Sequence, residues 1–214
     1  MLTARSAHDD LTGGHGVTST IARPGASRAA RLITDGLDPK TWIIADTLLI
    51  GWHTSRLAGI GWGLIGCLFA AVVPLAFIKY GIRRGRWADR HVGQRQQRIV
   101  VMAFIIASVA TGTLLLWAFS APRAMTALTA AMLVTLAALL AVTPAWKISV
   151  HAAVSSGSIA MLAVIHGPWT LLAYAVVAVV SWSRVELKDH TVAQVVAGAA
   201  VGGAVASGTF ALVQ

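Results

Sequence analysis

Long stretches without a charged side chain constrain the fold of this chain more than any other feature of its sequence. From residue 57 onward, successive apolar segments contain no Asp, Glu, Lys or Arg, namely 57–78, 99–119, 125–143, 148–165, 169–183 and 191–213. A bilayer has a hydrocarbon core about 30 Å thick, which about 20 helical residues cross. We therefore predict an all-α fold, a polytopic membrane helical bundle.

A shorter apolar segment, 41–53, precedes these spans. Thirteen helical residues rise about 20 Å, which is less than the hydrocarbon core. We expect about six transmembrane helices in all, with this one either short or re-entrant. The predicted transmembrane domain covers residues 39–214.

The N-terminal segment, residues 1–38, is polar and rich in Gly, Ser, Thr, Ala and Arg. Such a composition is typical of a flexible segment, and we expect it to end in a short interfacial helix at 27–35. It lacks the continuous apolar core of a signal peptide, so we do not expect it to be cleaved.

The composition excludes several classes of function. Charged residues make up 12% of the chain, against about a quarter in soluble domains. The net charge of +9 is explained by basic loops on the cytoplasmic side of a membrane, so we expect no nucleic-acid partner. Cys67 is the only cysteine, which excludes an intramolecular disulfide and a thiolate metal site. We expect no metal and no other cofactor.

The Lys and Arg residues indicate how the helices are oriented. If 41–53 and 57–78 form a hairpin, 15 of the 17 Lys and Arg lie on one side: five up to Lys40, seven in the loop 79–98, and three later ones. Only two, Arg56 and Arg123, are left for the other side. Cytoplasmic loops are enriched in Lys and Arg, so we predict that the basic side is cytoplasmic and that the membrane is the cell membrane.

Three polar clusters should meet on this basic side, because two spans separate each cluster from the next. One guanidinium group can donate two parallel hydrogen bonds to a phosphate group, and histidines serve as nucleophiles and as general acids. The clusters therefore predict a phosphate monoester or diphosphate site. They contain Lys79, Arg83, Arg84, Arg86, Asp89, Arg90, His91, Arg95 and Arg98; Lys147, Ser149 and His151; and Arg184, Glu186, Lys188, Asp189 and His190.

The order and spacing of these residues resemble the three motifs of the type 2 phosphatidic acid phosphatase (PAP2) superfamily of membrane lipid phosphatases. In "SRVELKDHTVAQ", Ser183 and Arg184 are followed after five residues by His190. "KISVHAA" places Ser149 and His151 as in the second motif, and "KYGIRRGR" gives a lysine, six residues and then an arginine. The resemblance covers roughly residues 57–213.

This resemblance implies a metal-independent phosphatase acting on an amphiphilic phosphate such as a polyprenyl phosphate, a prenyl diphosphate or phosphatidate. His190 would be the nucleophile that forms a phosphohistidine, and His151 the general acid for the leaving group. Phosphate ligands would come from Arg184, Ser149, Lys79 and Arg86, while Arg90, Arg95 and Arg98 compete for the role of the last two.

The chain also departs from the family pattern. Val150 stands where the family has Gly, Ile148 and Trp87 replace prolines, and Gln194 stands where it usually has Asp. Gln194 would orient His190 by accepting a hydrogen bond but supplies no charge. The alternative is a catalytically degenerate protein that binds a phospholipid or a protein partner. A small transporter is a further alternative, although no internal repeat is evident.

Two other features bear on packing. Asp46 lies in an apolar segment, where we expect a structural pair with a basic residue such as Arg56 or a loop arginine. The last span is rich in Gly and Ala, which lets membrane helices approach closely. We favour packing inside the bundle, with a homo-oligomer through this span as the alternative.

Overall fold

The computed structural model describes residues 27–86 and 95–214, and every regular element in these ranges is helical. A π-helical turn, Leu68–Val72, joins α2 to α3, and a 3₁₀ segment, Pro168–Ala173, precedes α7. The predicted all-α fold is confirmed. The α-helices are α1 (Arg28–Gly36), α2 (Pro39–Cys67), α3 (Val73–Arg83), α4 (Arg95–Ala118), α5 (Arg123–Val142), α6 (Val150–His166), α7 (Tyr174–Glu186) and α8 (Val192–Val213).

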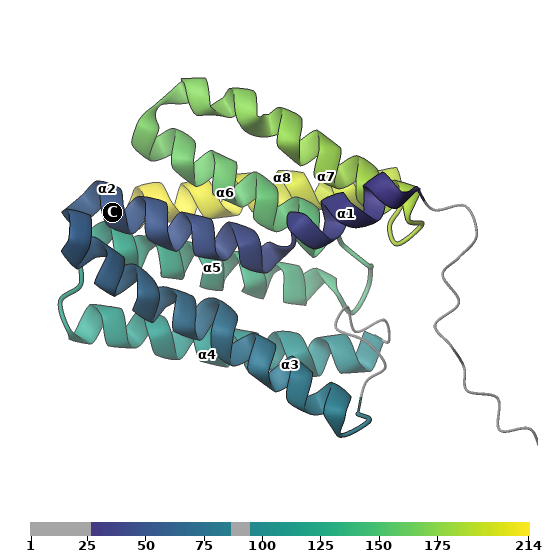
Figure 1. Ribbon diagram of the computed structural model, residues 1–214, viewed down its shortest axis with the longest axis horizontal. Coiled ribbons are helices and arrows are strands. Elements are labelled where there is room, and N and C mark those ends of the chain that lie inside the picture. Colours follow the sequence, from purple (N-terminus) through teal and green to yellow (C-terminus); the bar gives the residue numbers. More distant parts are fainter. Residues whose placement is uncertain (1–26, 87–94) are drawn as a thin grey trace, which may run out of the picture.

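The helix α2 is folded back on itself. Ser55 and Arg56 have non-helical backbone angles, and Arg56 has a φ of 52°. The chain reverses here, so that the arm 39–54 runs beside the continuation that leads into α3 (Figure 1). The hairpin that the count of Lys and Arg assumes is therefore present.

Glycines allow the two arms of this hairpin to approach closely. A Cβ atom on Gly59 would overlap the carbonyl group of Gly51 on the opposite arm. The first arm, 39–54, rises about 24 Å, which is short of the hydrocarbon core, as the sequence predicts.

The second arm contains the π-helical turn directly before Pro74, which lies in the first turn of α3. Proline has no N–H to donate to the carbonyl group four residues earlier, and its ring crowds that carbonyl. A π turn is one way in which a helix accommodates such a residue without ending. The arm therefore continues as a helix to Arg83.

Several helical stretches are long and apolar enough to cross a membrane. In the described residues these are Arg28–Arg83, which includes the hairpin, Gln96–Ala118, Arg123–Val142, Pro168–Glu186 and Val192–Val213. The helix α6 is apolar but shorter. We conclude that the chain is an integral, multi-pass membrane protein.

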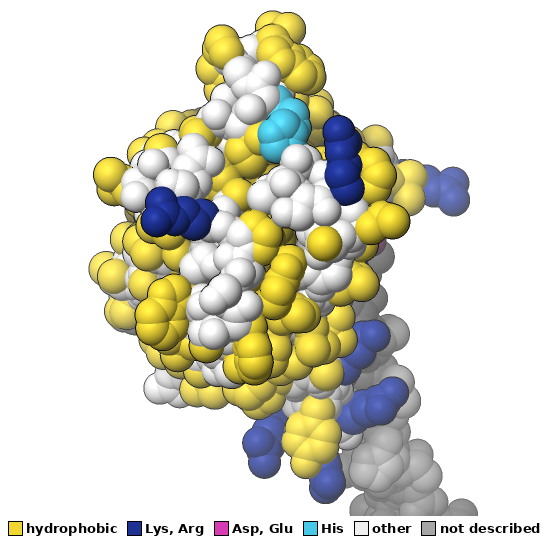
Figure 2. Space-filling model, turned by 90° about the vertical axis from the view of Figure 1, so that its left-hand side faces the viewer, with side chains coloured by type: hydrophobic (Ala, Val, Ile, Leu, Met, Phe, Trp, Pro, Cys, Tyr) yellow, Lys and Arg dark blue, Asp and Glu magenta, His cyan; other side chains and the backbone are white. Residues whose placement is uncertain are grey.

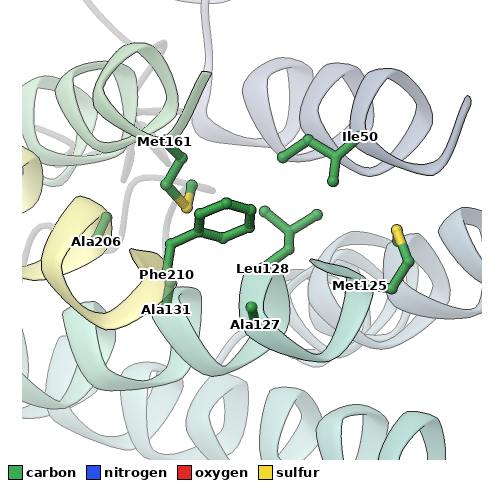
Figure 3. Packing of buried hydrophobic residues seen from close by; sticks show 8 residues of the cluster. All are labelled: Ile50, Met125, Ala127, Leu128, Ala131, Met161, Ala206 and Phe210. Carbon is green, nitrogen blue, oxygen red and sulfur yellow. The ribbon is translucent and has the colours of Figure 1, made fainter. Parts of the chain in front are cut away.

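The core lies where α8 packs between α5 and α6 and where α2 packs on α5 and α6. Figure 3 shows its largest cluster, in which the ring of Phe210 lies beside Met161 and the side chains of Ile50 and Leu128 face each other. All four are at most 3% exposed. This cluster fixes the relative positions of α2, α5, α6 and α8.

The two ends of the bundle differ in charge. The α1–α2 junction, the end of α3, the start of α4, the α5–α6 connection and the α7–α8 loop lie at one end, on the right in Figure 1. We call this the charged end, because it carries Lys40, Lys79, Lys147 and Arg184. The opposite end has few basic side chains and shows no acidic one in Figure 2.

The helix α1 packs on α7 at the charged end. Ala30 is fully buried, and the hydroxyl groups of Thr34 and Ser183 form a hydrogen bond of 3.0 Å. The predicted interfacial helix at 27–35 corresponds to α1. The packed structure therefore includes α1, ahead of the predicted boundary at residue 39, while residues 1–26 lie outside the described part.

Candidate functional site

A cavity of about 930 Å³ opens at the charged end and extends into the bundle between α2, α3, α4, α5 and α6. It brings together residues from all three predicted polar clusters. Such a volume is within the range of small-molecule sites. The ionisable residues that line it are Asp38, Lys40, Asp46, Lys79, Arg98, Lys147, His151, Arg184, Asp189 and His190.

His190 lies in the loop between α7 and α8, and the start of α8 holds its ring. Thr191 and Gln194 form a capping box, in which the Thr191 hydroxyl accepts from the Gln194 N–H. The Gln194 side-chain oxygen accepts from the Thr191 N–H at 3.1 Å and lies 3.2 Å from His190 Nδ1. The N–H of Thr191 requires an acceptor, so this atom is the amide oxygen.

This contact selects one form of the imidazole. An amide oxygen only accepts hydrogen bonds, so Nδ1 of His190 must carry the hydrogen. The lone pair of the neutral ring is then on Nε2. The sequence predicts this orienting role for Gln194, and the structure brings the two side chains together.

The charges of the site keep His190 neutral. Burial, followed by the positive charges of Lys147 and Arg184, lowers the pKa of His190 from 6.5 to about 4, although hydrogen bonds with the Gln194 side chain and with the Lys147 backbone oppose the shift. Protonation in this environment would place a third cation beside two others. At neutral pH, His190 therefore has an unprotonated Nε2.

Arg184 extends from the last turn of α7 into the cavity and is 4% exposed. Its Nη2 atom lies 3.1 Å from Oδ2 of Asp189. Its carbonyl oxygen accepts the backbone N–H groups of Asp189 and His190, at 3.1 and 3.2 Å. Asp189 therefore pairs with Arg184, whereas the side chain that contacts Nδ1 of His190 is that of Gln194.

His151 lines the same cavity from the first turn of α6 and is 8% exposed. The helix begins here because Ser149 is its N-cap and accepts from the N–H of Ala152 at 3.4 Å. Ser149 is fully buried and is not among the cavity-lining residues. Its hydroxyl therefore positions His151 through the helix start, and the structure does not bring Ser149 to the cavity surface.

Two hydrogen bonds join the α5–α6 connection to the α7–α8 segment. The N–H of Ser149 donates to the carbonyl oxygen of Gln194 at 3.3 Å. Lys147 Nζ donates to the carbonyl oxygen of Asp189 at 2.7 Å. These contacts hold the second and third motifs together, so that His151 and His190 line one cavity.

The first motif is only partly brought to the site. Lys79 lines the cavity from α3, but Arg86 is exposed and is not among the lining residues. Its carbonyl oxygen accepts from Nε2 of Gln97. Arg90 and Trp87 lie outside the described residues, as does the side chain of Arg95. Among the described arginines of this loop, the predicted competitor Arg98 lines the cavity from the first turn of α4.

Sequence reasoning missed Asp38 and Lys40 as members of the site. Both line the cavity, and their side chains form an ion pair of 3.1 Å. Asp38 also caps α2 by accepting from the N–H of Lys40. The available signal was the Asp-Pro pair, which is typical of a helix start. It predicts that the first span begins there, with its N-cap residue Asp38 at the charged end.

Among the described residues, Asp46 does not form the expected pair with a basic residue. Its Oδ2 atom accepts from the hydroxyl of Ser158 at 2.6 Å, and its side chain is 1% exposed. Arg56 lies at the opposite end, over the ring of Trp52. The pair with Arg56 does not form because Asp46 lies within the first arm of the hairpin, whereas Arg56 lies at its turn.

The arrangement offers a phosphate group several cations, an unprotonated imidazole nitrogen and a second imidazole in one cavity. In residues 27–86 and 95–214, no group of three His, Cys, Asp or Glu side chains is placed to hold a metal ion. No family model matches the chain, and comparison with curated proteins and with solved structures gave no match either.

Proposed function

We propose that the protein is an integral membrane phosphatase that hydrolyses a lipid phosphate or a prenyl (di)phosphate through a phosphohistidine intermediate. The observation that carries this proposal is the contact between Nδ1 of His190 and the Gln194 oxygen, in a cavity that Arg184 and His151 also line. It gives His190 the tautomer that a nucleophile needs.

In the proposed reaction, the Nε2 lone pair of His190 attacks phosphorus and the bond from phosphorus to the ester oxygen breaks. His151, in its protonated form, gives a proton to the leaving alkoxide. A water molecule then attacks phosphorus, His151 takes a proton from it, and the bond to Nε2 breaks to release inorganic phosphate.

The cations are proposed to stabilise the negative charge of the phosphoryl oxygens. Arg184 is buried at the entrance of the cavity, and Lys147, Lys79 and Arg98 line the same charged end. Phosphoryl transfer depends mainly on positioning and on such electrostatic stabilisation. A bound phosphate would compete with Asp189 for the guanidinium group of Arg184.

The position of the cavity suits an amphiphilic substrate. It opens at the end of the helices, where the head group of a lipid lies, and its inner walls are largely apolar. We propose that this end lies on the cytoplasmic side of the cell membrane, because Arg56 and Arg123 are the only Lys and Arg of the described residues at the other end.

Phosphate release by the detergent-purified protein tests this function. Prenyl phosphates, a prenyl diphosphate and phosphatidate are supplied with EDTA present. We expect metal-independent release that His190→Ala abolishes. His166→Ala, which removes a histidine at the opposite end, should leave release unchanged. Equal release by wild type and His190→Ala would contradict the proposal.

A catalytically degenerate binding protein is the second candidate, and two observations favour it. Val150 lines the cavity where the PAP2 pattern has Gly, and Gln194 provides no carboxylate. If the wild type binds an amphiphilic phosphate without releasing phosphate, the double change Val150→Gly and Gln194→Asp should create activity.

A homo-oligomer through α8 also stays a prediction. Gly198 and Gly202 on this helix lie against the backbone of α6 in the same chain. This contact favours the interpretation that the small residues serve packing inside the bundle.

A further inference from the structure

The inner part of the cavity contains polar atoms for which the described residues provide no partner. Asp46 is 1% exposed and Thr135 is 5% exposed, and both line the cavity. Oδ2 of Asp46 accepts from Ser158, but within residues 27–86 and 95–214 Oδ1 of Asp46 and Oγ1 of Thr135 have no hydrogen-bond partner. Buried polar atoms normally have partners, so these two require an explanation.

Three helices place this group at the same depth. Asp46 lies eight residues after the cap residue Asp38 on α2, and Ser158 lies seven residues after His151 on α6. Thr135 lies seven residues before the end of α5. At 1.5 Å per residue, all three lie about 10–12 Å inside the charged end.

The walls between the charged end and this group are apolar. They include Ile43, Ile78, Leu139 and Val154. The cavity ends against the core cluster of Figure 3, because Met161 and Ala206 belong both to that cluster and to the cavity lining. A ligand that reaches Asp46 from the charged end must therefore be a narrow apolar chain.

We propose that Asp46, Thr135 and Ser158 form a second binding subsite, which takes a hydroxyl group on the chain of a single-tailed amphiphilic phosphate. The ligand hydroxyl donates to Oδ1 of Asp46 and accepts from Oγ1 of Thr135. The basic residues at the entrance disfavour an ammonium group in this position. The inference rests on the proposed function for the phosphate end of the ligand.

Binding of alkyl phosphonates tests this subsite without turnover, because their carbon–phosphorus bond is not hydrolysed. A series of equal chain length carries one hydroxyl at successive carbons, and one member carries none. We expect the compound with its hydroxyl about 10–12 Å from phosphorus to bind about fivefold more tightly than the unsubstituted chain. Hydroxyls nearer to or farther from phosphorus should give no gain.

Two variants connect this preference to the subsite. Thr135→Val and Asp46→Leu should each abolish the gain while the unsubstituted phosphonate binds as before. Thr129→Val is the matched control, since Thr129 is a buried threonine of the same helix that does not line the cavity and bonds to its own backbone. Thr135→Val keeps the test decisive if Asp46→Leu does not fold.

Equal binding of every member of the series would overturn the proposal, and it would indicate that water fills the position beside Asp46 and Thr135. A preference that persists in both variants would overturn it as well. Phosphate release is measured separately. If the protein prefers the hydroxylated chain but releases no phosphate, the result would support the subsite and contradict the proposed enzymatic function.

Discussion

At the residue scale, the properties of the candidate site depend on Gln194. Its amide oxygen accepts from the Thr191 N–H and lies beside Nδ1 of His190, so one side chain both caps α8 and orients the imidazole. An Asp-to-Asn change in a serine protease triad loses about four orders of magnitude, because the histidine adopts the wrong tautomer. The capping box prevents that here, since it fixes the oxygen of Gln194 toward the ring.

Changing Gln194 separates orientation from charge. Gln194→Glu keeps both hydrogen bonds and adds a negative charge that raises the pKa of His190 and stabilises the phosphohistidine cation. We expect phosphate release near pH 8 to rise about tenfold. Gln194→Leu should reduce release at least about a hundredfold, because the imidazole loses its acceptor. Thr191→Ala controls for the cap alone and should retain most of the activity.

The charge of Lys147 should control the pH dependence of the reaction. With a pKa of about 4, His190 is protonated and inactive only in strong acid, so kcat/KM should fall below about pH 4–5. Lys147→Met removes a cation that lowers this pKa, and the acid limb should move up by about one unit. Lys188→Met, a change of equal charge in the α7–α8 loop that carries His190, should not move it.

The same shift affects stability. The unfolded chain binds a proton with a pKa near 6.5, whereas folded His190 binds it with a pKa of about 4. The free energy of unfolding should therefore fall as the pH is lowered from 6.5 toward 4, and this fall should be smaller in Lys147→Met. If kcat/KM fell at the same acidic pH in the wild type and in Lys147→Met, the result would contradict this account of His190.

At the scale of elements, the contact between α6 and α8 assembles the site. His151 lies in the first turn of α6, whose N-cap is Ser149, and His190 directly precedes Thr191, the N-cap of α8. Gly202 of α8 lies against Ala153 of α6, where a Cβ atom would overlap the carbonyl oxygen of Ala153. Small residues at such a contact let the two backbones approach, which brings the two histidine-bearing helix starts together.

Gly202→Ala should therefore affect both stability and activity. Overpacking of this kind costs about 1–3 kcal/mol, and any separation of α6 from α8 also separates His151 from His190. We expect a lower temperature of unfolding in detergent and weaker phosphate release. Gly208→Ala is the control, because a Cβ there has no atom within 4 Å, and its properties should equal those of the wild type. Wild-type stability in Gly202→Ala would show that this close contact is not required.

At the scale of the whole molecule, the distribution of charge defines the orientation. The polar residues of the site and most Lys and Arg lie at the charged end, while the surface in Figure 2 is mainly hydrophobic and uncharged. The site cations contribute to this asymmetry themselves. The orientation therefore needs a test that does not depend on counting charges.

Two cysteine variants provide this test in a Cys67→Ala background. Ser120 lies in the turn between α4 and α5 at the opposite end, and Lys188 lies in the α7–α8 loop; both are exposed and both have positive φ. We expect a membrane-impermeant thiol reagent to label Ser120→Cys in intact cells and Lys188→Cys only after permeabilisation. The reverse pattern would place the site on the outer side.

Much of the architecture was determined by the sequence itself. Uncharged segments long enough to cross a bilayer specify where the chain must be helical, because only a helix satisfies its own backbone in lipid. Their number and order also bring Lys79, His151, Arg184 and His190 to one end, since helices joined by short connections alternate in direction. The local capping box of Thr191 and Gln194 is readable from four consecutive residues.

The tertiary structure alone decided which polar residues meet and which do not. Ser149 and Arg86 have suitable chemistry, but Ser149 is buried as a helix cap and Arg86 is exposed beyond the end of α3, so neither lines the cavity. Asp46 accepts a hydrogen bond from Ser158, which lies 112 residues away in the sequence, because the hairpin packs on α6. Spacing along a helix fixes the depth and the face of a side chain, but its neighbours depend on which helix packs against that face.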